Sequence, residues 1–389
     1  MNRTSPGNSG RLRRRLGFTV VLLLGSFLRG QVPPGSPLTF YERFIAIDGA
    51  CAWPNLSLLP DGRIAALIWP YANHAVTEGS AECWTSADGG VTWRKSGVPV
   101  PHEPGTNRLN LAAGAVDGKL VTVVGGWNER VPYEPGKSLG PAAHHGVTLQ
   151  PVTAVSTDAG ATWRQGPEAS LPRRADGKAL VPYGRVARLT DGGIAACFYG
   201  EGVFFYCSKD DGATWELRGT IVAGKTHNET TWVQLDNGDL FAAARTYGDM
   251  GLDGYRSKDG GRTWHAEGAL TLARQHPADL LKLPDGRVLL SYGGRNPGLW
   301  GIWVQLADAG VKHWSAPLLL VNLEGSSEFQ RTPAPSSDGG YPSTVQLADG
   351  TFVTAYYSRG VPAHQRYHVG VVRWRLPKNG LPVLPAAEQ

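Results

Sequence analysis

An eight-residue word recurs four times in this chain of 389 residues. It reads SADGGVTW at 86–93, STDAGATW at 156–163, SKDDGATW at 208–215 and SKDGGRTW at 257–264. An altered fifth copy, LADAGVKHW, occupies 306–314. From the second copy onward the words start about 50 residues apart, and a fixed period of this size is the signature of a repeat architecture.

A second repeat, independent of the first, is a pair of short apolar runs joined by an Asp-Gly or Asn-Gly turn. The six turns are Asp61-Gly62, Asp117-Gly118, Asp191-Gly192, Asn237-Gly238, Asp285-Gly286 and Asp349-Gly350. Such a dipeptide between apolar runs predicts a β-hairpin with a type I′ turn, in which both central residues have positive φ. Six hairpins, followed by copies of the word and without long helical patterns, predict an all-β fold: a six-bladed β-propeller of four-stranded antiparallel blades.

Within such a blade the word falls on the turn between the last two strands. Its Ser and Asp side chains can hydrogen-bond the local backbone, its Gly can adopt an unusual φ, and its Trp can pack between blades. The word repeats because blades repeat. It therefore predicts a structural turn and not a catalytic motif.

The positive charge of the chain is concentrated at its N-terminus. The whole sequence carries +5, but residues 1–30 contain six Arg and no acid, which leaves 5 − 6 = −1 for the remainder. A near-neutral domain lacks the basic surface that binds nucleic acid. The run RLRRR and the apolar run LGFTVVLLLGSFL predict a signal peptide over residues 1–30 of a secreted or periplasmic protein; an uncleaved anchor is the alternative.

Residues 31–40 are then a linker, residues 41–377 the propeller and residues 378–389 a C-terminal tail. The apolar run is too short to span a bilayer comfortably, and no later segment is apolar enough. No membrane span is therefore expected in the mature protein. The paired Arg before Leu16 faintly resembles a twin-arginine export signal.

Export permits disulfides, and four cysteines allow three pairings. Cys197 and Cys207 flank the turn Gly-Glu-Gly and can face each other across a hairpin, which leaves Cys51 with Cys83. Four buried free thiols are the other possibility. Neither a metal-ligand spacing nor a Gly-rich phosphate loop is present, so no metal or organic cofactor is expected. The sequence does not indicate an oligomeric state.

The word matches the Asp-box, Ser-x-Asp-x-Gly-x-Thr-Trp, and the boxes with the six hairpins resemble the sialidase superfamily over about residues 40–377. The resemblance implies a six-bladed propeller. Asp-boxes also occur in propellers that are not sialidases, so function has to be read from the central cleft. Eight residues before the hairpin turn lie Tyr341 in the sixth unit (349 − 8) and Glu229 in the fourth (237 − 8). This shared register predicts that both side chains reach the same end of the central channel.

The resemblance implies roles for three residues. DGGYPSTVQLADG resembles the strand of the sialidase nucleophile, which gives Tyr341. NETTWVQLDNGDLFAAAR resembles the strand that carries the activating carboxylate, Glu229, and Arg245 matches an arginine that binds the substrate carboxylate. A neutral phenol suits this reaction, because the carboxylate on the anomeric carbon of a sialoside would repel an anionic nucleophile. A phenol with a pKa of about 10 needs an adjacent base, and such tyrosine chemistry is an exception among glycosidases.

Two other arginines of the sialidase pattern are missing. The first-blade motif Arg-Ile-Pro is replaced by CAWP, with Ala52 in the arginine position. Leu299 or Trp300 stands where a third arginine is expected, and Arg295 lies near enough to substitute. The resemblance therefore places one carboxylate-binding arginine securely.

The acid/base also departs from the sialidase pattern. The loop WPYANHAVTEGSAECW contains no Asp, and its titratable candidates are His74 and Glu78. Asp338, three residues before Tyr341, offers another route. As a general base acting on water it would give an inverting mechanism in which Tyr341 only shapes the pocket. The alternative for Asp338 is a turn-forming residue before Gly339-Gly340.

Further substrate-binding candidates follow from the same register. They are Arg108, Tyr183, Arg185 and His276, at or near the starts of inner strands. His227, two residues before Glu229, is a candidate for orienting it. Each of them also has a purely structural reading.

Together these features predict an exo-acting glycoside hydrolase of the sialidase superfamily that releases terminal sialic acid or a related acidic sugar from a glycan or glycoconjugate. One alternative is a glycosidase of different sugar specificity that uses Asp338 and Glu229. The other is a non-catalytic carbohydrate-binding propeller. Release of free sialic acid separates the first two, and loss of turnover in Tyr341→Phe and Glu229→Gln excludes the third.

Overall fold

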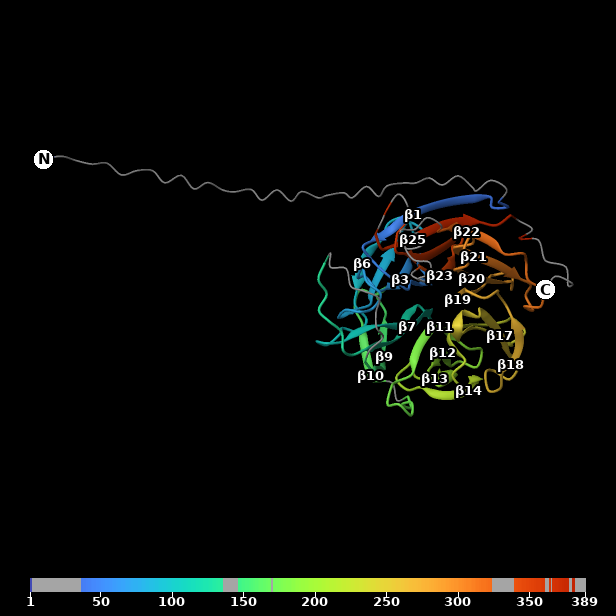
Figure 1. The fold of residues 1–389 in the computed structure, drawn as a ribbon, viewed down its shortest axis with the longest axis horizontal. Coiled ribbons are helices and arrows are strands. Elements are labelled where there is room, and N and C mark those ends of the chain that lie inside the picture. Colours follow the sequence, from blue (N-terminus) through green and yellow to red (C-terminus); the bar gives the residue numbers. More distant parts are fainter. Residues whose placement is uncertain are drawn as a thin grey trace.

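The computed structural model describes residues 36–135, 146–168, 171–323, 339–360 and 366–377, together with residues 1, 364, 380 and 381. Within these residues the protein is all-β, and the only helical element is a short 3-10 turn, η1 (Tyr247–Asp249). Figure 1 shows the sheets arranged around a common centre, with the chain passing from one to the next in sequence order. None of the described residues forms a helix that could cross a membrane.

The antiparallel strands fall into six groups, four of which are separate four-stranded sheets. These sheets consist of β2 (Asn55–Leu58), β3 (Ile64–Ile68), β5 (Glu82–Ser86) and β6 (Arg94–Gly97); β15 (His227–Gln234), β16 (Leu240–Thr246), β17 (Leu252–Ser257) and β18 (His265–Ala269); β19 (Gln275–Lys282), β20 (Val288–Gly294), β21 (Gly301–Ala307) and β22 (Leu318–Asn322); and β23 (Gly339–Gln346), β24 (Phe352–Ser358) and β25 (His368–Arg375) with β1 (Phe40–Asp48). In each of these sheets the innermost strand pairs with the next strand in sequence, which is the second strand of the predicted hairpin.

The other two groups share one nine-stranded sheet. It contains β7 (Asn107–Val116), β8 (Lys119–Trp127), β9 (Thr148–Ser156) and β10 (Arg164–Glu168), then β11 (Val181–Arg188), β12 (Ile194–Tyr199), β13 (Gly202–Ser208) and β14 (Glu216–Ala223), with β4 (Gly79–Ser80) on the edge of β7. β7 and β11 run parallel where residues 112–113 face 184–185. Gly114 permits this approach, since a Cβ there would lie 1.8 Å from the carbonyl oxygen of Val186. The six expected units are therefore present as six antiparallel groups, two of them joined.

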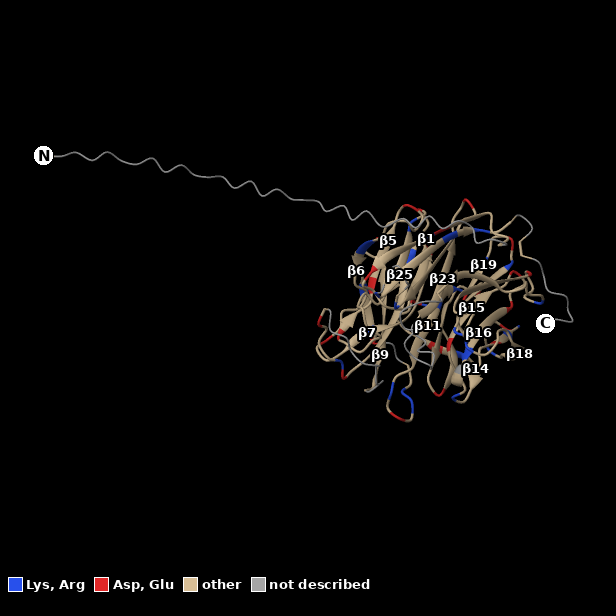
Figure 2. Cartoon of the chain, turned by 45° about the horizontal axis from the view of Figure 1, so that its top comes forward, with Lys and Arg blue, Asp and Glu red and all other residues tan. Residues whose placement is uncertain are grey.

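The core lies between neighbouring groups. Leu67 of β3, for example, belongs to the same buried cluster as Leu120 of β8 and Val152 of β9. Figure 2 shows the charged residues mostly on turns and loops, while the strands are mostly uncharged. Charged residues that could form a functional site are therefore expected on the loops at the ends of the innermost strands.

The two ends of the described chain meet in one sheet. β1 pairs antiparallel with β25 from Phe40 opposite Arg375 to Asp48 opposite His368. β1 is thus the outer strand of a sheet whose other three strands come from the C-terminal end. Ile47 of β1 is buried there, and Phe44 is half-buried against the same core.

The hairpin turns were predicted correctly in position, but the predicted turn type is wrong at five of the six. Both central residues have positive φ only at Asp117 and Gly118. In the other five turns the Gly alone is left-handed, and its N–H donates to the carbonyl three residues earlier, as from Gly62 to Leu59 at 3.0 Å. These are type I turns closed by a left-handed Gly. The side chain of Asp61 favours this form, because it accepts a hydrogen bond from the Arg63 N–H at 3.0 Å.

The Asp-boxes lie where the sequence predicted, between the third and fourth strands of four groups. In the second copy the Ser156 hydroxyl donates to Asp158 and accepts from the N–H of Gly160, both at 2.8 Å. Hydrogen bonds led by the Thr162 hydroxyl lower the pKa of Asp158 to about 2. The box also packs against the preceding group, since a Cβ on Gly160 would lie 2.3 Å from the Cys83 sulfur. The word is a structural turn, as predicted.

All four cysteines are buried free thiols. Cys197 on β12 faces Phe205 on β13, whereas Cys207 faces Ala195. The two sulfurs therefore belong to different cross-strand pairs, and the predicted bridge across this hairpin is wrong. Burial raises the pKa of the Cys83 thiol to about 12, as expected for an inert packing residue.

Candidate active site

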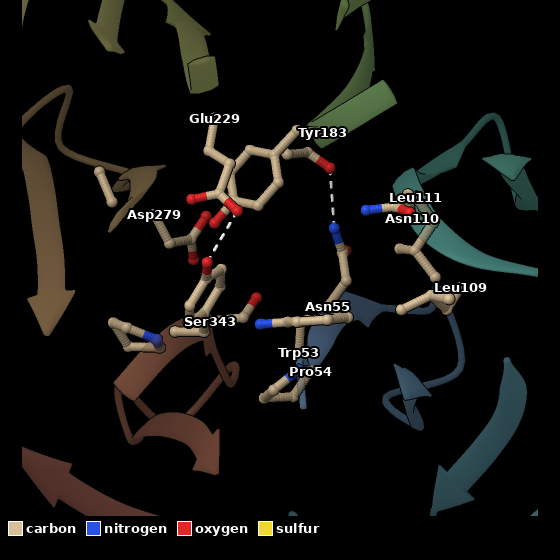
Figure 3. A pocket seen from close by; sticks show the side chains of 14 residues that line it. Trp53, Pro54, Asn55, Leu109, Asn110, Leu111, Tyr183, Glu229, Asp279 and Ser343 are labelled. Carbon is tan, nitrogen blue, oxygen red and sulfur yellow. Dashed lines mark hydrogen bonds between the residues drawn. The ribbon is translucent and has the colours of Figure 1, made fainter. Parts of the chain in front are cut away.

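A cleft of about 540 Å³ opens at the centre of the arrangement, where β15 and β23 begin. Tyr341 on β23, Glu229 on β15 and Arg245 on β16 line it. A narrower pocket continues from the same two residues, Tyr341 and Glu229, toward Asp279. Figure 3 shows Glu229, Tyr183 and Asp279 reaching this pocket from three different strands, and Trp53 reaching it from the loop before β2.

Tyr341, Glu229 and Arg245 form one hydrogen-bonded trio. The Tyr341 hydroxyl donates to Glu229 Oε1 at 2.7 Å, and Arg245 Nη1 donates to Glu229 Oε2 at 2.5 Å. The same Nη1 donates to the Tyr341 oxygen at 3.0 Å. The sequence register predicted that the phenol and the carboxyl would reach the same end of the channel, and the structure brings them into direct contact.

Backbone irregularities aim these side chains. Tyr341 has a left-handed φ of +50°, and the pairing of β23 with β24 shifts register between Gly340 and Ser343. β15 shifts register between His227 and Thr230, on either side of Glu229. Bulges of this kind redirect side chains beside functional sites. A left-handed tyrosine costs on the order of 1–3 kcal/mol, which the surrounding sheet must offset.

The Tyr341 hydroxyl is difficult to ionise in the resting state. Burial raises the pKa of this phenol, which is only 7% exposed, and the neighbouring Glu229 carboxylate raises it further. Arg245 and Arg295 act in the opposite direction but do not outweigh burial. The ring packs near Trp53 at 5.7 Å and Tyr183 at 6.4 Å between centroids. Proton transfer to Glu229 is therefore the route by which this oxygen can become a nucleophile.

Arg295 lies at the site, as the sequence suggested. Its guanidinium is 5.7 Å from the centre of the Tyr341 ring and is 3% exposed. Its Nη1 lies 3.2 Å from Nδ1 of His276, which is fully buried. Because a guanidinium only donates, this His276 nitrogen has to accept, so its ring is neutral with the proton on Nε2. His276 holds Arg295 and does not itself line the cleft.

Three predicted residues contact other parts of the protein. Glu78 accepts a hydrogen bond from the Gly105 N–H at 2.5 Å and is not in the cleft lining, because strand β4 turns it toward that loop. Arg108 donates to the Gln150 carbonyl at 2.8 Å.

His227 binds Asp253 at 3.0 Å and not Glu229. The bulge in β15 separates the two side chains that simple alternation would place on one face. Asp338 lies outside the described residues, so the structure says nothing about its position.

Arg185 lies deeper, inside the channel. Its guanidinium donates to both oxygens of Asp279 at 2.9 and 2.7 Å and to the Thr344 carbonyl at 3.0 Å. Asp279 lines the pocket under Tyr341, whereas Arg185 lines a cavity at the opposite end of the inner strands. The ion pair therefore separates the two spaces. Burial raises the pKa of Asp279, although Arg185 opposes the shift.

Trp53 occupies the wall that an arginine of the sialidase pattern would use. Ala52 is fully buried with a φ of +46° and does not line the cleft. The next residue, Trp53, lines the cleft and lies 5.1 Å from His74 in an edge-on contact. Trp300 is buried in another apolar cluster and does not line the cleft. Of the two titratable residues predicted in the loop after the first hairpin, only His74 reaches the cleft.

Several cleft residues were not predicted from the sequence. They are Trp53, Trp127, Arg130, Arg174, Asp176, Lys178, Tyr199, Lys225, Asn228 and Tyr247. Five of these ten lie on loops that join the outermost strand of one group to the innermost strand of the next: Trp53, Arg174, Asp176, Lys178 and Lys225. The charged stretch RRADGK at 173–178 precedes β11 in this way, and its place before an inner strand was the available signal.

The charge of the cleft favours an anion. Its lining contains six cationic side chains, Arg130, Arg174, Lys178, Lys225, Arg245 and Arg295, and two carboxylates, Asp176 and Glu229. No cluster of three or more His, Cys, Asp or Glu side chains that could hold a metal occurs in the part of the chain that the structure describes. The site can bind an acidic molecule beside a phenol and a carboxylate that share a proton.

Solved structures with a similar fold include several sialidases. A protein of unknown function from Dyadobacter fermentans is 24% identical, with a TM-score of 0.69 over 86% of this chain and 98% of that one. The Hadza microbial sialidase Hz136 is 18% identical, with a TM-score of 0.62 over 85% of this chain and 66% of that one. The NanB sialidase from Streptococcus pneumoniae is 15% identical, with a TM-score of 0.60 over 90% of this chain and 72% of that one. These likenesses show an all-β fold that resembles the sialidase propellers.

No curated protein matches the sequence significantly. A sequence profile described as the BNR repeat-like domain matches residues 135–354, which include three of the four intact Asp-boxes. Because this match covers more than half of the chain, the protein belongs to the family of BNR repeat-like domains.

Proposed function

We propose that this protein is an exo-acting glycoside hydrolase that releases a terminal acidic sugar, of the sialic acid class, from a glycan. The contact between the Tyr341 hydroxyl and Glu229 at 2.7 Å carries the proposal. A buried phenol that donates to a carboxylate at the floor of an open cleft is the arrangement that a tyrosine nucleophile and its base require. Arg245, in contact with both, is available to a substrate carboxylate.

The proposed scaffold is a closed six-bladed propeller over residues 41–377. The six antiparallel groups around one centre and the pairing of β1 with β25 support it (Figure 1). A signal peptide over residues 1–30 and a linker over residues 31–40 precede it in this proposal. The protein then acts outside the cytoplasm, where terminal sugars of glycans are accessible.

The proposed reaction has two halves. The Tyr341 oxygen bonds to the anomeric carbon as the bond to the leaving oxygen breaks, and Glu229 takes the phenol proton. His74 gives a proton to the leaving oxygen, since an imidazole can donate near neutral pH and this one lines the cleft. Water then attacks the same carbon and gives a proton to His74, and Tyr341 leaves and regains its proton from Glu229. The anomeric configuration is retained.

Two substitutions test this proposal directly. Tyr341→Phe removes the nucleophile and is expected to lower kcat/KM on a sialoside by at least about 10³-fold, and Glu229→Gln by about 10²–10⁴-fold. Release of free sugar from a panel of terminal sialosides and uronides is followed by mass spectrometry. Tyr206→Phe, which removes another buried tyrosine hydroxyl far from the cleft, is the matched control.

Each competing function gives a different result. If the wild-type protein binds the panel but releases nothing, it is a carbohydrate-binding propeller. If Tyr341→Phe keeps its turnover while Asp338→Asn loses it, the reaction is that of the alternative glycosidase with Glu229 and Asp338. Full activity in Glu229→Gln would exclude Glu229 from both reactions.

A further inference from the structure

The cleft has a second group of cations beyond those that touch Tyr341. Arg245 and Arg295 surround the phenol, whereas Arg174, Lys178 and Lys225 line the part of the same cleft formed by the loops before β11 and β15. Lys225 is exposed and Lys178 is half-buried, so these loops form the solvent side of the cleft. A sugar seated on Tyr341 leaves the next sugar of its glycan on this side.

Arg174 is held in a fixed position. Its N–H and carbonyl close a tight turn, donating to the Lys178 carbonyl and accepting from the Gly177 N–H, both at 2.9 Å. Its guanidinium binds Asp176 at 2.9 Å and Glu201 at 2.7 Å. The stem packs on Gly200, where a Cβ would lie 2.9 Å from Arg174 Cδ. The charge of Arg174 is therefore compensated by two carboxylates, and its side chain holds the loop in place.

The two lysines, in contrast, have no carboxylate partner within ion-pair distance among the described residues. Lys178 follows the Arg174 turn, and its N–H donates to Asp176 at 3.2 Å. Lys225 lies in a turn that the Tyr247 N–H anchors through the Thr226 carbonyl at 2.9 Å. Both ammonium groups are thus carried by anchored loops without local compensation, an arrangement that attracts an anionic ligand.

Tyr247 connects the two groups of cations. Burial raises the pKa of its phenol, Arg174 and Arg245 lower it, and Glu229 raises it. Its side chain lines the cleft together with Arg174 on the solvent side and the Glu229–Arg245 pair at the floor. The cleft is therefore continuous from the trio to the lysines.

We propose that Lys178 and Lys225 form a subsite for a second negative charge, on the sugar next to the scissile bond. This inference rests on the proposed hydrolysis of a terminal acidic sugar and names its preferred substrate class: glycans in which the penultimate sugar carries a carboxylate or a sulfate ester. Exposed lysines bind both groups as point charges, so the chemistry of the anion is left to the experiment.

The test compares three substrates with the same terminal sialic acid: one with a neutral penultimate sugar, one with a sulfated one and one with a carboxylated one. The ratio of kcat/KM for each anionic substrate to that for the neutral one is the readout. The wild-type ratio is expected to fall by about 3- to 20-fold in Lys178→Ala/Lys225→Ala, the sum of two exposed ion pairs. It should also fall in about 1 M salt, where the Debye length is about 3 Å.

The control is Lys209→Ala/Lys258→Ala, which removes the same charge from two exposed Asp-box turns outside the cleft. An unchanged ratio in the Lys178→Ala/Lys225→Ala protein, or a wild-type ratio near one, overturns the subsite. If the ratio is larger for the sulfated or for the carboxylated substrate, the group with the larger ratio is the one that the subsite prefers.

Calorimetric binding of the sulfated and carboxylated disaccharides that lack the terminal sugar gives a readout without turnover. Binding that is lost in Lys178→Ala/Lys225→Ala supports the subsite even if no substrate is hydrolysed, whereas absent hydrolysis alone counts against the proposed function. Absent binding of both disaccharides by the wild-type protein rejects the subsite whatever the turnover.

Discussion

His276 shows how a residue remote from the substrate can set the geometry of this cleft. It is fully buried, and the lone pair on Nδ1 receives the Arg295 guanidinium at 3.2 Å. Arg295 in turn lies over the Tyr341 ring. The imidazole therefore acts through the arginine as a positioning residue.

Removing this acceptor should weaken substrate binding more than chemistry. His276→Ala is expected to raise KM by about tenfold, since a hydrogen bond to a charged group is worth about 1.5–3 kcal/mol, while kcat changes much less. His276→Asn, whose amide oxygen can accept from Arg295, should restore most of the loss. Steady-state kinetics on one sialoside separate the two parameters. Equal losses of kcat in both variants, or no rescue by Asn, would argue for a merely structural histidine.

The candidate site was predictable where the backbone register fixes it. Counting back from the hairpin turns found Tyr341 and Glu229, because a turn defines which residue of a strand reaches the channel end. His227 was proposed from its place two residues before Glu229, and this prediction failed because the strand shifts register between His227 and Thr230 and alternation breaks there. Lys225 lies on a loop, whose path no period describes, and sequence alone could not assign it to the cleft.

The Asp-box is the element that couples neighbouring groups. Ser156 is buried and accepts from the Gly160 N–H, which lies against the preceding group at Cys83. Trp163 and Cys83 belong to one apolar cluster. The box is thus both a turn and an inter-sheet contact.

Ser156→Ala should destabilise the whole protein. It leaves the buried Gly160 N–H without its acceptor, which costs about 1–3 kcal/mol of unfolding free energy. Urea unfolding followed by tryptophan fluorescence measures the difference. Thr157→Ala, at the adjacent exposed position, is the control and should stay within about 0.5 kcal/mol of the wild type. If both variants unfold at the same urea concentration as the wild type, the Ser156 hydroxyl contributes nothing to stability.

The elements themselves were largely predictable from short-range chemistry. Each Asp-Gly or Asn-Gly pair correctly located a hairpin, but both central residues have the positive φ of the predicted turn type only at Asp117-Gly118. The Gly is left-handed in both possible turns, and the local bond from Asp61 to Arg63 selects between them. The joining of β7 to β11 was not predicted, because it depends on the close approach of Gly114 to Val186, two residues far apart in sequence.

At the scale of the whole molecule, the sheet formed by β1 with β23–β25 ties the N-terminal strand to the C-terminal ones. A protein that begins at Gly49 lacks β1 and should lose about 3 kcal/mol or more, because buried Ile47 and half-buried Phe44 no longer pack on β25. Thermal unfolding by circular dichroism compares it with a protein that begins at Ser36.

A peptide of residues 36–48 added in excess should raise the melting temperature of the shortened protein by mass action. The same peptide should leave the protein that begins at Ser36 unchanged. Equal melting temperatures for the two proteins without peptide would mean that β1 does not hold the last sheet.

The ion pair between Arg185 and Asp279 has a consequence for how reaction products depart. Asp279 lines the pocket under Tyr341 and Arg185 lines the cavity at the far end of the inner strands, so the pair lies across the axis between these two spaces. In the proposed reaction, substrate and products then pass through the same opening of the cleft. In the proposed reaction the severed glycan therefore withdraws before the monosaccharide behind it, and this monosaccharide leaves last and competes with incoming substrate.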